Sequence, residues 1–437
     1  MANEIKNQQD ILVKLNIAAL NPMQKEAITV IEKTANTILL SPTGTGKTLA
    51  FLLPIIKNLN IDNPEVQALI VVPTRELAIQ IEQVVRNMGS GFKVNAVYGG
   101  RAKSKDKIEL KHIPAILVGT PGRILDHFDD DRFSKASINT LVLDEYDKSL
   151  EIGFESEMIE ILDSLPAVSK RILTSATQGV KIPNFVKFNK PTVLDYLLEK
   201  VDPKLTVKTV VSDDKNKLGT LLQLLRHLGN QPGIIFCNFR ESIEMLSNFL
   251  NENNISHTCF SGGMEQKDRE RALIKFRNGT SQILVATDLA ARGIDIPELK
   301  FIIHYELPHS AVEFTHRNGR TARVNEKGTA YVLKWKNQLL PEFIEKTEPV
   351  EIPKAASQVA ELWETLFISG GRKDKISKGD IAGLFIKQGN ITNEQLGAIE
   401  LKQDCAFVAV PLALANQLVS TLNNSRLKKK KVRIYIL

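Results

Sequence analysis

The sequence predicts an α/β protein with two parallel-sheet domains followed by a small α+β domain. Short apolar runs alternate with amphipathic stretches of helical period over most of the chain. Apolar strands that are separated by helices are typical of parallel sheets covered on both faces. The chain has 437 residues, which is too many for a single hydrophobic core.

The first domain is predicted over residues 1–200. Its expected strands are the apolar runs 37–40, 68–72, 115–118, 140–143 and 171–173, and a helix is expected at 49–58. The pattern pauses between residues 199 and 214, where Asp202-Pro203 and a polar run occur. A polar stretch with proline between two periodic segments predicts a hinge.

The second domain is predicted over residues 207–345. Strands are expected at 233–236, 282–285, 301–305 and 329–333, with helices at 241–253 and 266–278. Pro349 and Pro353 lie in a weakly patterned stretch, 345–358, which predicts a linker. The two domains are expected to be loose copies in architecture, without clear sequence repetition.

The third domain is predicted over residues 363–437, where the rhythm changes. Strands at 366–369, 406–410 and 432–437 and helices at 378–387 and 412–422 fit a β-α-β-β-α-β order. This segment holds 12 Lys/Arg against 6 Asp/Glu, whereas the whole chain has a net charge of +7. Nearly all the excess charge is therefore here, and it predicts an anion-binding module.

Composition excludes several classes of protein. Hydrophobic content of 43% and charged content of 24% are those of a soluble globular protein. The most apolar stretch, 406–415, holds Pro411 and is half the length that a membrane span needs, roughly 20 residues. The three cysteines, Cys237, Cys259 and Cys405, form no CxxC pair. We expect no membrane partner, no zinc site, and a location in the reducing cytoplasm.

The stretch SPTGTGKT, residues 41–48, has the chemistry of a phosphate cradle. Its glycines let backbone N–H groups approach phosphate oxygens, Lys47 supplies charge to the β/γ-phosphates, and the Thr48 hydroxyl reaches Mg²⁺. Ser41 replaces the first glycine of the template and is small enough to fit. The alternative is a chance turn rich in Gly and Thr. We expect nucleotide contacts from Ser41, Thr43, Gly44, Thr45, Gly46, Lys47 and Thr48.

Two further clusters suggest an NTPase that is completed by closure of two domains. Asp144 and Glu145, in DEYD, end an apolar run: the Asp is expected to hold Mg²⁺ through water and the Glu to position or deprotonate the attacking water. Arg320 and Arg323 are spaced i, i+3, and an arginine finger is worth on the order of 10³–10⁵ in rate. The alternatives are an ordinary acidic turn and a solvated basic face.

With these motifs in order, the first ~345 residues resemble the DEAD-box RNA helicases. PTREL (73–77), Gly99-Gly100, TPGR (120–123), DEYD (144–147) and SAT (175–177) match the first half of the family's set. Residues 236–240, the pair Gln266 and Arg269, TDLAARGID (287–295) and HRNGRTAR (316–323) match the second half. The resemblance implies two RecA-like domains and ATP-dependent opening of RNA duplexes.

The resemblance also implies roles for particular residues. Gln24 would read the adenine, and Gly293, Asp295 and Arg323 would meet ATP from the second domain. Asp147, Ser175 and Thr177 would couple ATP to RNA. The RNA strand would be lined by Thr74, Arg75, Gly100, Thr120, Arg123, Arg240 and Thr287, which contact the backbone without reading bases.

Two departures from the family pattern stand out. No Phe, Tyr or Trp precedes Phe51, so the aromatic that usually stacks on adenine has no counterpart. Tyr146 replaces the small Ala of DEAD. Because both carboxylates remain, we expect hydrolysis to be retained, while its coupling to duplex opening stays open.

The segment beyond Trp363 resembles the RRM-like RNA-binding domain of DbpA-type helicases, notably in residues 377–384. The resemblance implies recognition of a hairpin in large-subunit ribosomal RNA during ribosome assembly. Phe367 and Phe407 are candidate stacking residues or else core residues. Lys428, Lys429, Lys430 and Lys431 are candidate RNA contacts or else a solvated run.

The sequence thus predicts an RNA-dependent ATPase that uses ATP and Mg²⁺ and acts as a monomer on ribosomal RNA or pre-ribosomal particles. A non-unwinding ATP-dependent RNA clamp or assembly scaffold is the alternative, which Tyr146 keeps open. A DNA-remodelling ATPase is a weaker third hypothesis. The RNA hairpin that is recognised cannot be deduced from the sequence.

Overall fold

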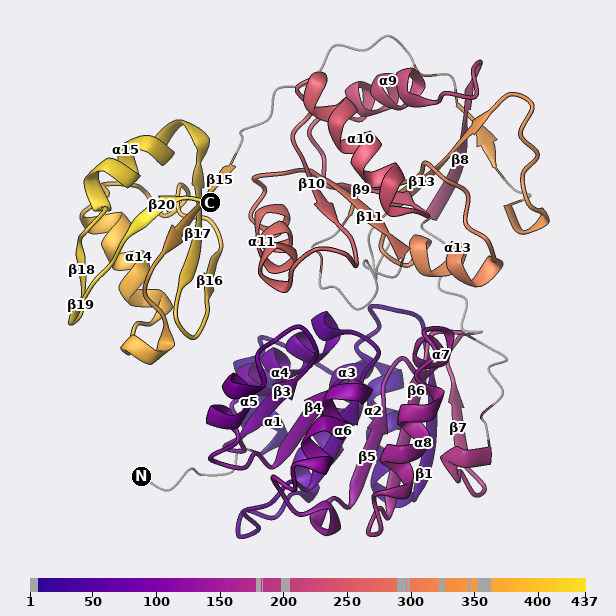
Figure 1. Cartoon of the computed structure of the whole chain (residues 1–437), viewed down its shortest axis with the longest axis vertical. Helices are drawn as coiled ribbons and strands as arrows, with labels where there is room; N and C mark the ends of the chain where they lie inside the picture. Colours follow the sequence, from indigo (N-terminus) through magenta and orange to yellow (C-terminus); the bar gives the residue numbers. More distant parts are fainter. Residues whose placement is uncertain are drawn as a thin grey trace. The chain divides into compact units, whose positions relative to one another are not determined.

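The predicted fold class is confirmed: two parallel-sheet RecA-like domains precede a small antiparallel-sheet domain (Figure 1). The structure, a computed structural model, describes residues 7–177, 182, 184–197, 205–288, 296, 299–321, 327–344, 347–350, 352 and 363–437. It divides into two compact units near residue 203. Among the helices of these residues, none has the length and apolarity that crossing a membrane requires.

The first domain is built on a seven-stranded sheet of order β3-β4-β2-β5-β6-β1-β7, and all its strand pairs are parallel. The strands are β1 (Asn36–Leu40), β2 (Ala68–Val71), β3 (Val94–Val97), β4 (Ile116–Gly119), β5 (Thr140–Leu143), β6 (Lys170–Ser175) and β7 (Thr192–Asp195). Because β6 lies between β5 and β1, the loops after these three strands meet at one edge of the sheet.

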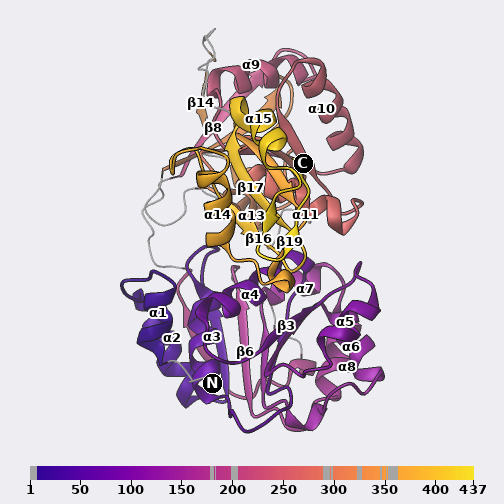
Figure 2. The same ribbon diagram turned by 90° about the vertical axis from the view of Figure 1, so that its left-hand side faces the viewer.

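Helices cover both faces of this sheet (Figure 2). They are α1 (Gln8–Lys14), α2 (Pro22–Lys33), α3 (Lys47–Asn58), α4 (Arg75–Met88), α5 (Lys103–Glu109), α6 (Pro121–Asp129), α7 (Tyr146–Glu151) and α8 (Glu155–Asp163). Successive side chains of a strand point to opposite faces. In β2, accordingly, Ile70 joins the apolar cluster under α1–α4, and Leu69 joins the cluster under α6 and α8.

The second domain repeats the strand order of the first. Its sheet runs β10-β11-β9-β12-β13-β8-β14, which is the first order with seven added to each number. The expected architectural duplication is thus confirmed. The strands are β8 (Leu205–Ser212), β9 (Gly233–Cys237), β10 (His257–Phe260), β11 (Ile283–Thr287), β12 (Phe301–His304), β13 (Gly328–Trp335) and β14 (Glu348–Pro349), and the helices are α9 (Leu218–Leu228), α10 (Arg240–Glu252), α11 (Gln266–Arg277) and α13 (Ala311–Asn318).

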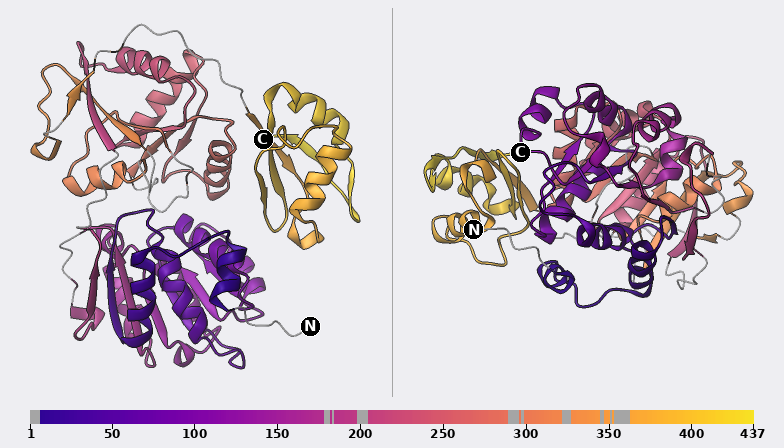
Figure 3. Two further views of the ribbon diagram at one scale, coloured as in Figure 1. Left: turned by 180° about the vertical axis from the view of Figure 1, so that it is seen from behind. Right: turned by 90° about the horizontal axis from the view of Figure 1, so that it is seen from below.

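The third domain has the predicted β-α-β-β-α-β order, with both helices on one face of the sheet (Figure 3). Its main elements are β15 (Trp363–Ile368), α14 (Lys378–Lys387), β16 (Ile399–Leu401), β17 (Ala406–Pro411), α15 (Leu412–Leu422) and β20 (Ile434–Ile436). The sheet order is β16-β17-β15-β20, and a two-stranded hairpin of β18 (Arg426–Leu427) and β19 (Lys430–Lys431) precedes β20. The core lies between sheet and helices.

Several strands were missed by the sequence pattern. β3 and β10, with the sequences VNAV and HTCF, are interrupted by polar residues. β8 falls in the segment predicted as a hinge, and it pairs with β13 over eight residues. β14 falls in the predicted linker, at the edge of the second sheet, where a sheet tolerates proline. In each case the neighbouring strand supplies the order that local composition does not indicate.

Candidate active site and nucleic-acid contacts

The predicted phosphate cradle is the loop between β1 and α3. Gly44 and Gly46 have φ of 83° and 86°, a region that glycine adopts readily and side chains rarely do. A Cβ on Gly46 would lie 2.4 Å from Nε2 of Gln24. The loop therefore needs glycine both for its backbone and for the space beside it, and it ends at the N-terminus of α3, where anions are stabilised.

Ser41 fits the position that the template gives to glycine. Its hydroxyl lies 2.8 Å from the Thr45 hydroxyl, which in turn donates to the Pro42 carbonyl at 2.9 Å. Because Thr45 uses its single proton on Pro42, Ser41 is the donor to Thr45. The serine thus closes the loop with a side-chain bond.

Lys47 is 9% exposed and donates to the carbonyls of Ser41 and Pro42. Burial lowers the pKa of its ammonium to about 8, although Asp144 and Glu145 oppose the shift. A phosphate anion beside this nitrogen would raise its pKa as the two carboxylates do, because an opposite charge favours the charged form.

Asp144 and Glu145, the first two residues of DEYD, follow β5, and Thr174 of β6 binds the carboxylate of the first and the backbone of the second. The Thr174 hydroxyl donates to Asp144 and accepts the backbone N–H of Glu145 at 3.1 Å. Burial, and then the charge of Glu145, raise the pKa of Asp144 to about 6. Sequence reasoning missed Thr174; its only signal is a hydroxyl that follows the apolar pair Ile172 and Leu173 in the strand beside the cradle.

Lys148 is a second residue that the sequence did not single out. Its side chain is fully buried, and its ammonium lies 3.1 Å from the Glu145 carboxylate. Glu145 itself has φ of 49°. The carboxylate expected to act on water is thus held from both ends, at its backbone by Thr174 and at its side chain by Lys148.

Three residues expected to couple ATP to RNA lie together. The Thr177 hydroxyl donates to Asp147 at 2.8 Å, and the Ser175 hydroxyl donates to the Thr177 carbonyl at 3.1 Å. This pair of bonds joins the end of β6 to the start of α7. Tyr146, by contrast, is fully buried in the core with Leu143, and its hydroxyl has no hydrogen-bond partner among the described residues.

Gln24 contacts the cradle directly. Its Oε1 accepts the N–H of Asn21 at 3.0 Å, and its Nε2 donates to the Gly46 carbonyl at 3.3 Å. One donor hydrogen and one lone pair of the amide remain for a purine edge. Asn21 also donates to the Thr45 carbonyl at 3.0 Å, so the start of α2 is tied to the loop.

In the first domain, the expected RNA contacts gather at the starts of helices. Thr74 is the N-cap of α4, and its hydroxyl accepts the Leu77 N–H at 3.3 Å. Thr120 is the N-cap of α6, with no side-chain cap bond. Gly100 has φ of 78°, and a Cβ there would lie 2.3 Å from the Arg75 guanidinium. Arg75 therefore lies against the double-glycine backbone.

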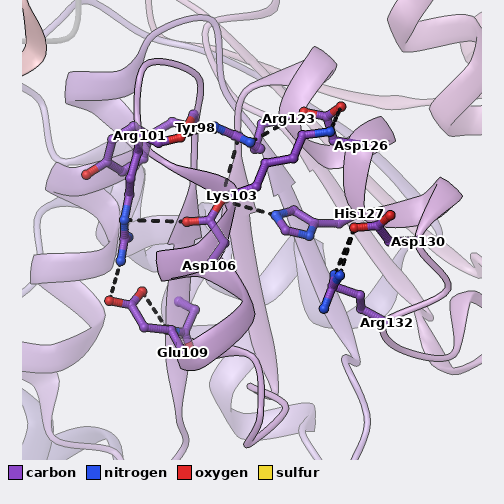
Figure 4. A network of polar contacts seen from close by, with 11 residues as sticks. Tyr98, Arg101, Lys103, Asp106, Glu109, Arg123, Asp126, His127, Asp130 and Arg132 are labelled. Atoms are coloured by element: carbon purple, nitrogen blue, oxygen red, sulfur yellow. Dashed lines mark hydrogen bonds and ion pairs between the residues drawn. The ribbon is translucent and has the colours of Figure 1, made fainter.

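Arg123 was expected to line RNA, but its guanidinium is turned into the protein (Figure 4). It is 7% exposed and donates through Nε to the Tyr98 carbonyl at 3.1 Å and through Nη2 to the Arg101 carbonyl. Its Nη1 lies 3.5 Å from Asp126. In this structure Arg123 ties α6 to the loop that contains Gly99 and Gly100.

In the second domain, Arg317 is the first of the three arginines of HRNGRTAR. Its side chain is fully buried, and its Nε donates to Asp288 at 2.8 and 3.0 Å. It also donates to Asn238 at 2.7 Å and lies over the Phe236 ring. Sequence reasoning passed over Arg317, which joins three of the motifs of this domain.

The other predicted residues of the second domain have different surroundings. Arg320 is 5% exposed, and its backbone N–H donates to the Arg317 carbonyl. Thr287 ends β11 and is half-buried, and Arg240 begins α10 exposed, with an ion pair to Glu244 at 3.0 Å. Gly293, Asp295 and Arg323 lie outside the described residues.

In the third domain, Phe367 and Phe407 lie on the sheet face away from the helices. Phe367 meets Phe407 edge-on at 5.6 Å between ring centroids and stacks on Tyr435 at 4.7 Å. Neither phenylalanine belongs to the apolar cluster under the helices, which takes Leu366 from the strand of Phe367. Phe407 is nevertheless buried, at 5% exposed, whereas Phe367 is half-buried. Tyr435 is 42% exposed and was missed, because its segment is short.

The lysine run is partly neutralised by acidic side chains of its own domain. Lys428 lies 2.9 Å from Asp380, and Lys430 lies 2.7 Å from Asp374. Lys429 and Lys431 are exposed. The hairpin of β18 and β19 thus presents some of its charge to solvent and uses the rest to hold α14, through Asp380, and the turn before it, through Asp374.

Known families match all three domains. Residues 21–185 match the DEAD/DEAH box helicase family, residues 216–325 match the helicase conserved C-terminal domain, and residues 365–436 match the DbpA RNA binding domain. ATP-dependent RNA helicase DbpA of Escherichia coli (strain K12) is 30% identical over 98% of this chain and 96% of its own length. ATP-dependent RNA helicase DbpA of Bacillus subtilis (strain 168) is 29% identical over 94% and 93%.

Solved structures agree with this relationship. Mss116p bound to ssRNA and AMP-PNP superimposes with a TM-score of 0.71 at 26% identity, over 79% of this chain and 78% of that chain. Dbp5 of S. cerevisiae bound to RNA and ADP BeF3 has the same fold, with a TM-score of 0.70 at 24% identity, over 79% of this chain and 94% of that chain.

Proposed function

Because the chain belongs to the DEAD-box ATP-dependent RNA helicases of the DbpA type, we propose that it uses ATP to open RNA duplexes during assembly of the large ribosomal subunit. The observation that carries this proposal is the meeting of cradle and carboxylates at one edge of the first sheet. Lys47 there faces the combined charge of Asp144 and Glu145, and its pKa responds to both.

The residues present fit a nucleotide with Mg²⁺. Lys47 would bind the β/γ-phosphates, and the hydroxyl of Thr48 and the carboxylate of Asp144, through water, are oxygen ligands of the kind that Mg²⁺ prefers. Mg²⁺ in such a site neutralises charge that develops on the phosphates. Glu145 would orient or deprotonate the attacking water. Arg320 and Arg323 would stabilise the transition state on closure of the two domains.

RNA would be bound through its backbone by the first two domains. Thr74, Arg75, Gly100 and Thr120 offer hydroxyl, guanidinium and N–H donors at helix starts, a chemistry that positions phosphates without reading sequence. Arg240 and Thr287 would extend the path in the second domain. Asp147, Ser175 and Thr177 would link this path to the carboxylates through the bonds between β6 and α7.

The third domain would supply the choice of RNA. Phe367 and Tyr435 offer faces on which bases stack, whereas Phe407 is 5% exposed and packs edge-on against Phe367. Lys429 and Lys431 offer charge to phosphates. Its match to the DbpA RNA binding domain supports a structured ribosomal target, and a cytoplasmic monomer fits that role. The ring of Tyr146 lies in the core, and measured strand displacement distinguishes a helicase from a clamp.

The test is strand displacement measured beside ATP hydrolysis. We expect a ribosomal hairpin to stimulate turnover and a short duplex next to it to open with ATP. Glu145→Gln should bind nucleotide but lose hydrolysis by about 10²–10⁴-fold, as expected for a missing general base. Hydrolysis without strand displacement by the native protein would instead support the clamp.

A further inference from the structure

A buried carboxylate joins the two predicted RNA-backbone elements of the first domain. Asp106 lies in α5, and its side chain has no exposed surface. Its oxygens lie 3.4 Å from Arg101 Nε, 3.6 Å from Arg123 Nε and 3.2 Å from His127 Nε2 (Figure 4). A buried carboxylate is costly unless it is paired and hydrogen-bonded. Here its partners come from a loop and from α6.

The partners of Asp106 hold one short loop. We call residues 98–101 the double-glycine loop. Arg123 donates to the carbonyls of Tyr98 and Arg101, which are the two ends of this loop. Arg101 is the last residue of the loop, and its guanidinium meets Asp106 and Glu109. Asp106 therefore holds both the loop and the helix turn that binds the loop.

The double-glycine loop has little to fix its shape by itself. Gly100 has φ of 78°, and two successive glycines leave a backbone with wide conformational freedom. Ordering such a backbone at the moment of binding reduces affinity, whereas a preorganised loop avoids that cost. Side chains that hold the loop in one conformation thus favour RNA binding without any contact to RNA.

We propose that Asp106 is a positioning residue for RNA binding, which holds the double-glycine loop to the first turns of α6 through Arg101, Arg123 and His127. The inference rests on the proposed function, in which this loop and the start of α6 contact the RNA backbone. It gives Arg123 an indirect role: its guanidinium shapes the loop rather than reaching the RNA.

The experiment is Asp106→Asn in the full-length protein, with ATPase activity measured against the concentration of a structured RNA. We expect the RNA concentration for half-maximal activation to rise about tenfold. The kcat at saturating RNA and the KM for ATP should stay within twofold. Simple electrostatics predicts the opposite sign, because removing a negative charge strengthens attraction to phosphates.

The matched control is Asp130→Asn. Asp130 is a carboxylate at the end of α6 that pairs with Arg132 and is partly exposed. The control variant loses the same charge nearby without a contact to the double-glycine loop. The RNA concentration for half-maximal activation should therefore change by less than twofold. Equal behaviour of the two variants, or a fall in kcat as large as the loss of RNA affinity, would overturn the proposal.

Two further variants distinguish failure of the role proposed for Asp106 from failure of the proposed RNA site. Arg101→Gln removes one partner of Asp106 at a half-buried position. It should raise the RNA concentration for half-maximal activation about threefold to tenfold, and it can be measured even if Asp106→Asn does not fold. Arg75→Ala tests the RNA site itself. If Arg75→Ala weakens RNA binding and both other variants leave it unchanged, the positioning role proposed for Asp106 is wrong. If all three leave it unchanged, the proposed RNA site is wrong as well.

Discussion

The ammonium of Lys148 lies 3.1 Å from the carboxylate of Glu145, three residues earlier in the chain, and the lysine side chain is fully buried. Glu145 is the only acceptor of Lys148 among the described residues. An ion pair at this depth orients both of its members, because the side chain of Lys148 is fully buried and that of Glu145 is 11% exposed. The proposed general base therefore has a fixed side chain as well as a fixed backbone.

Lys148→Met should lower kcat about tenfold while the KM for ATP changes less than twofold, because Glu145 loses its orientation but the cradle keeps its contacts. Lys148→Arg should retain most activity, since it keeps the charge. Steady-state ATPase kinetics at saturating RNA provide the measurement. Lys187→Met, which breaks an exposed ion pair with Asp163, is the control and should leave kcat unchanged. A kcat as high as that of the native protein in Lys148→Met would show that Glu145 needs no such support.

Tyr146→Phe should leave the free energy of unfolding unchanged or raise it by up to about 1 kcal/mol, because it removes a buried hydroxyl without a described partner. Tyr146→Ala, which restores the family's residue, should instead cost about 3–5 kcal/mol through the cavity left in the core. Denaturant titration of the three proteins measures both. A stable Tyr146→Ala variant would mean that the surrounding core collapses to fill the space.

Asp144 should make stability depend on pH. Its pKa is raised from 3.8 to about 6 by burial, so between these values the folded protein binds more protons than the unfolded chain. The contribution of this group to the free energy of unfolding therefore falls as pH rises from about 4 to 6, by up to about 3 kcal/mol. Asp144→Asn should flatten that part of the profile. Unfolding measured in nucleotide-free protein at several pH values tests the slope.

Removing residues 363–437 should preserve ATPase activity on generic RNA at saturating concentration, because none of the residues assigned to ATP lies there. Selectivity for a ribosomal hairpin should be lost, and binding should depend less steeply on salt, since fewer phosphate contacts release fewer counterions. Binding of both proteins to ribosomal and arbitrary hairpins across a salt series is the measurement. Unchanged selectivity and unchanged salt slope would exclude this domain as the targeting module.

Replacing Lys429 and Lys431 with Ala tests the same domain more locally. Both side chains are exposed, whereas Lys428 and Lys430 hold acidic partners. The double variant should reduce the salt slope but keep much of the selectivity, if shape is read by the aromatic face around Phe367. In the matched control, replacing Lys428 and Lys430 with Ala should instead weaken the attachment of the hairpin to α14 and to the turn before it.

What the sequence determined by itself was local or followed a regular period. The strand–helix alternation indicates parallel sheets, and the glycines of residues 41–48 indicate a cradle whose backbone angles at Gly44 and Gly46 follow from residue type. The order of motifs indicated the family, and the uneven charge indicated a third domain. The periodicity and the glycine pattern depend on neighbours within a few residues, and the order of the motifs and the distribution of charge are read directly along the chain.

Tertiary structure alone decided which distant side chains meet. Thr174 clamps Asp144 because β6 lies next to β5, across 30 residues of chain. Arg123 turns inward because the loop at Tyr98 brings two carbonyls to it across 25 and 22 residues. The partner of a buried polar group depends on the strand order and on the free energy that is lost when the group stays unpaired. Neither the strand order nor this free energy can be read from a short stretch of sequence.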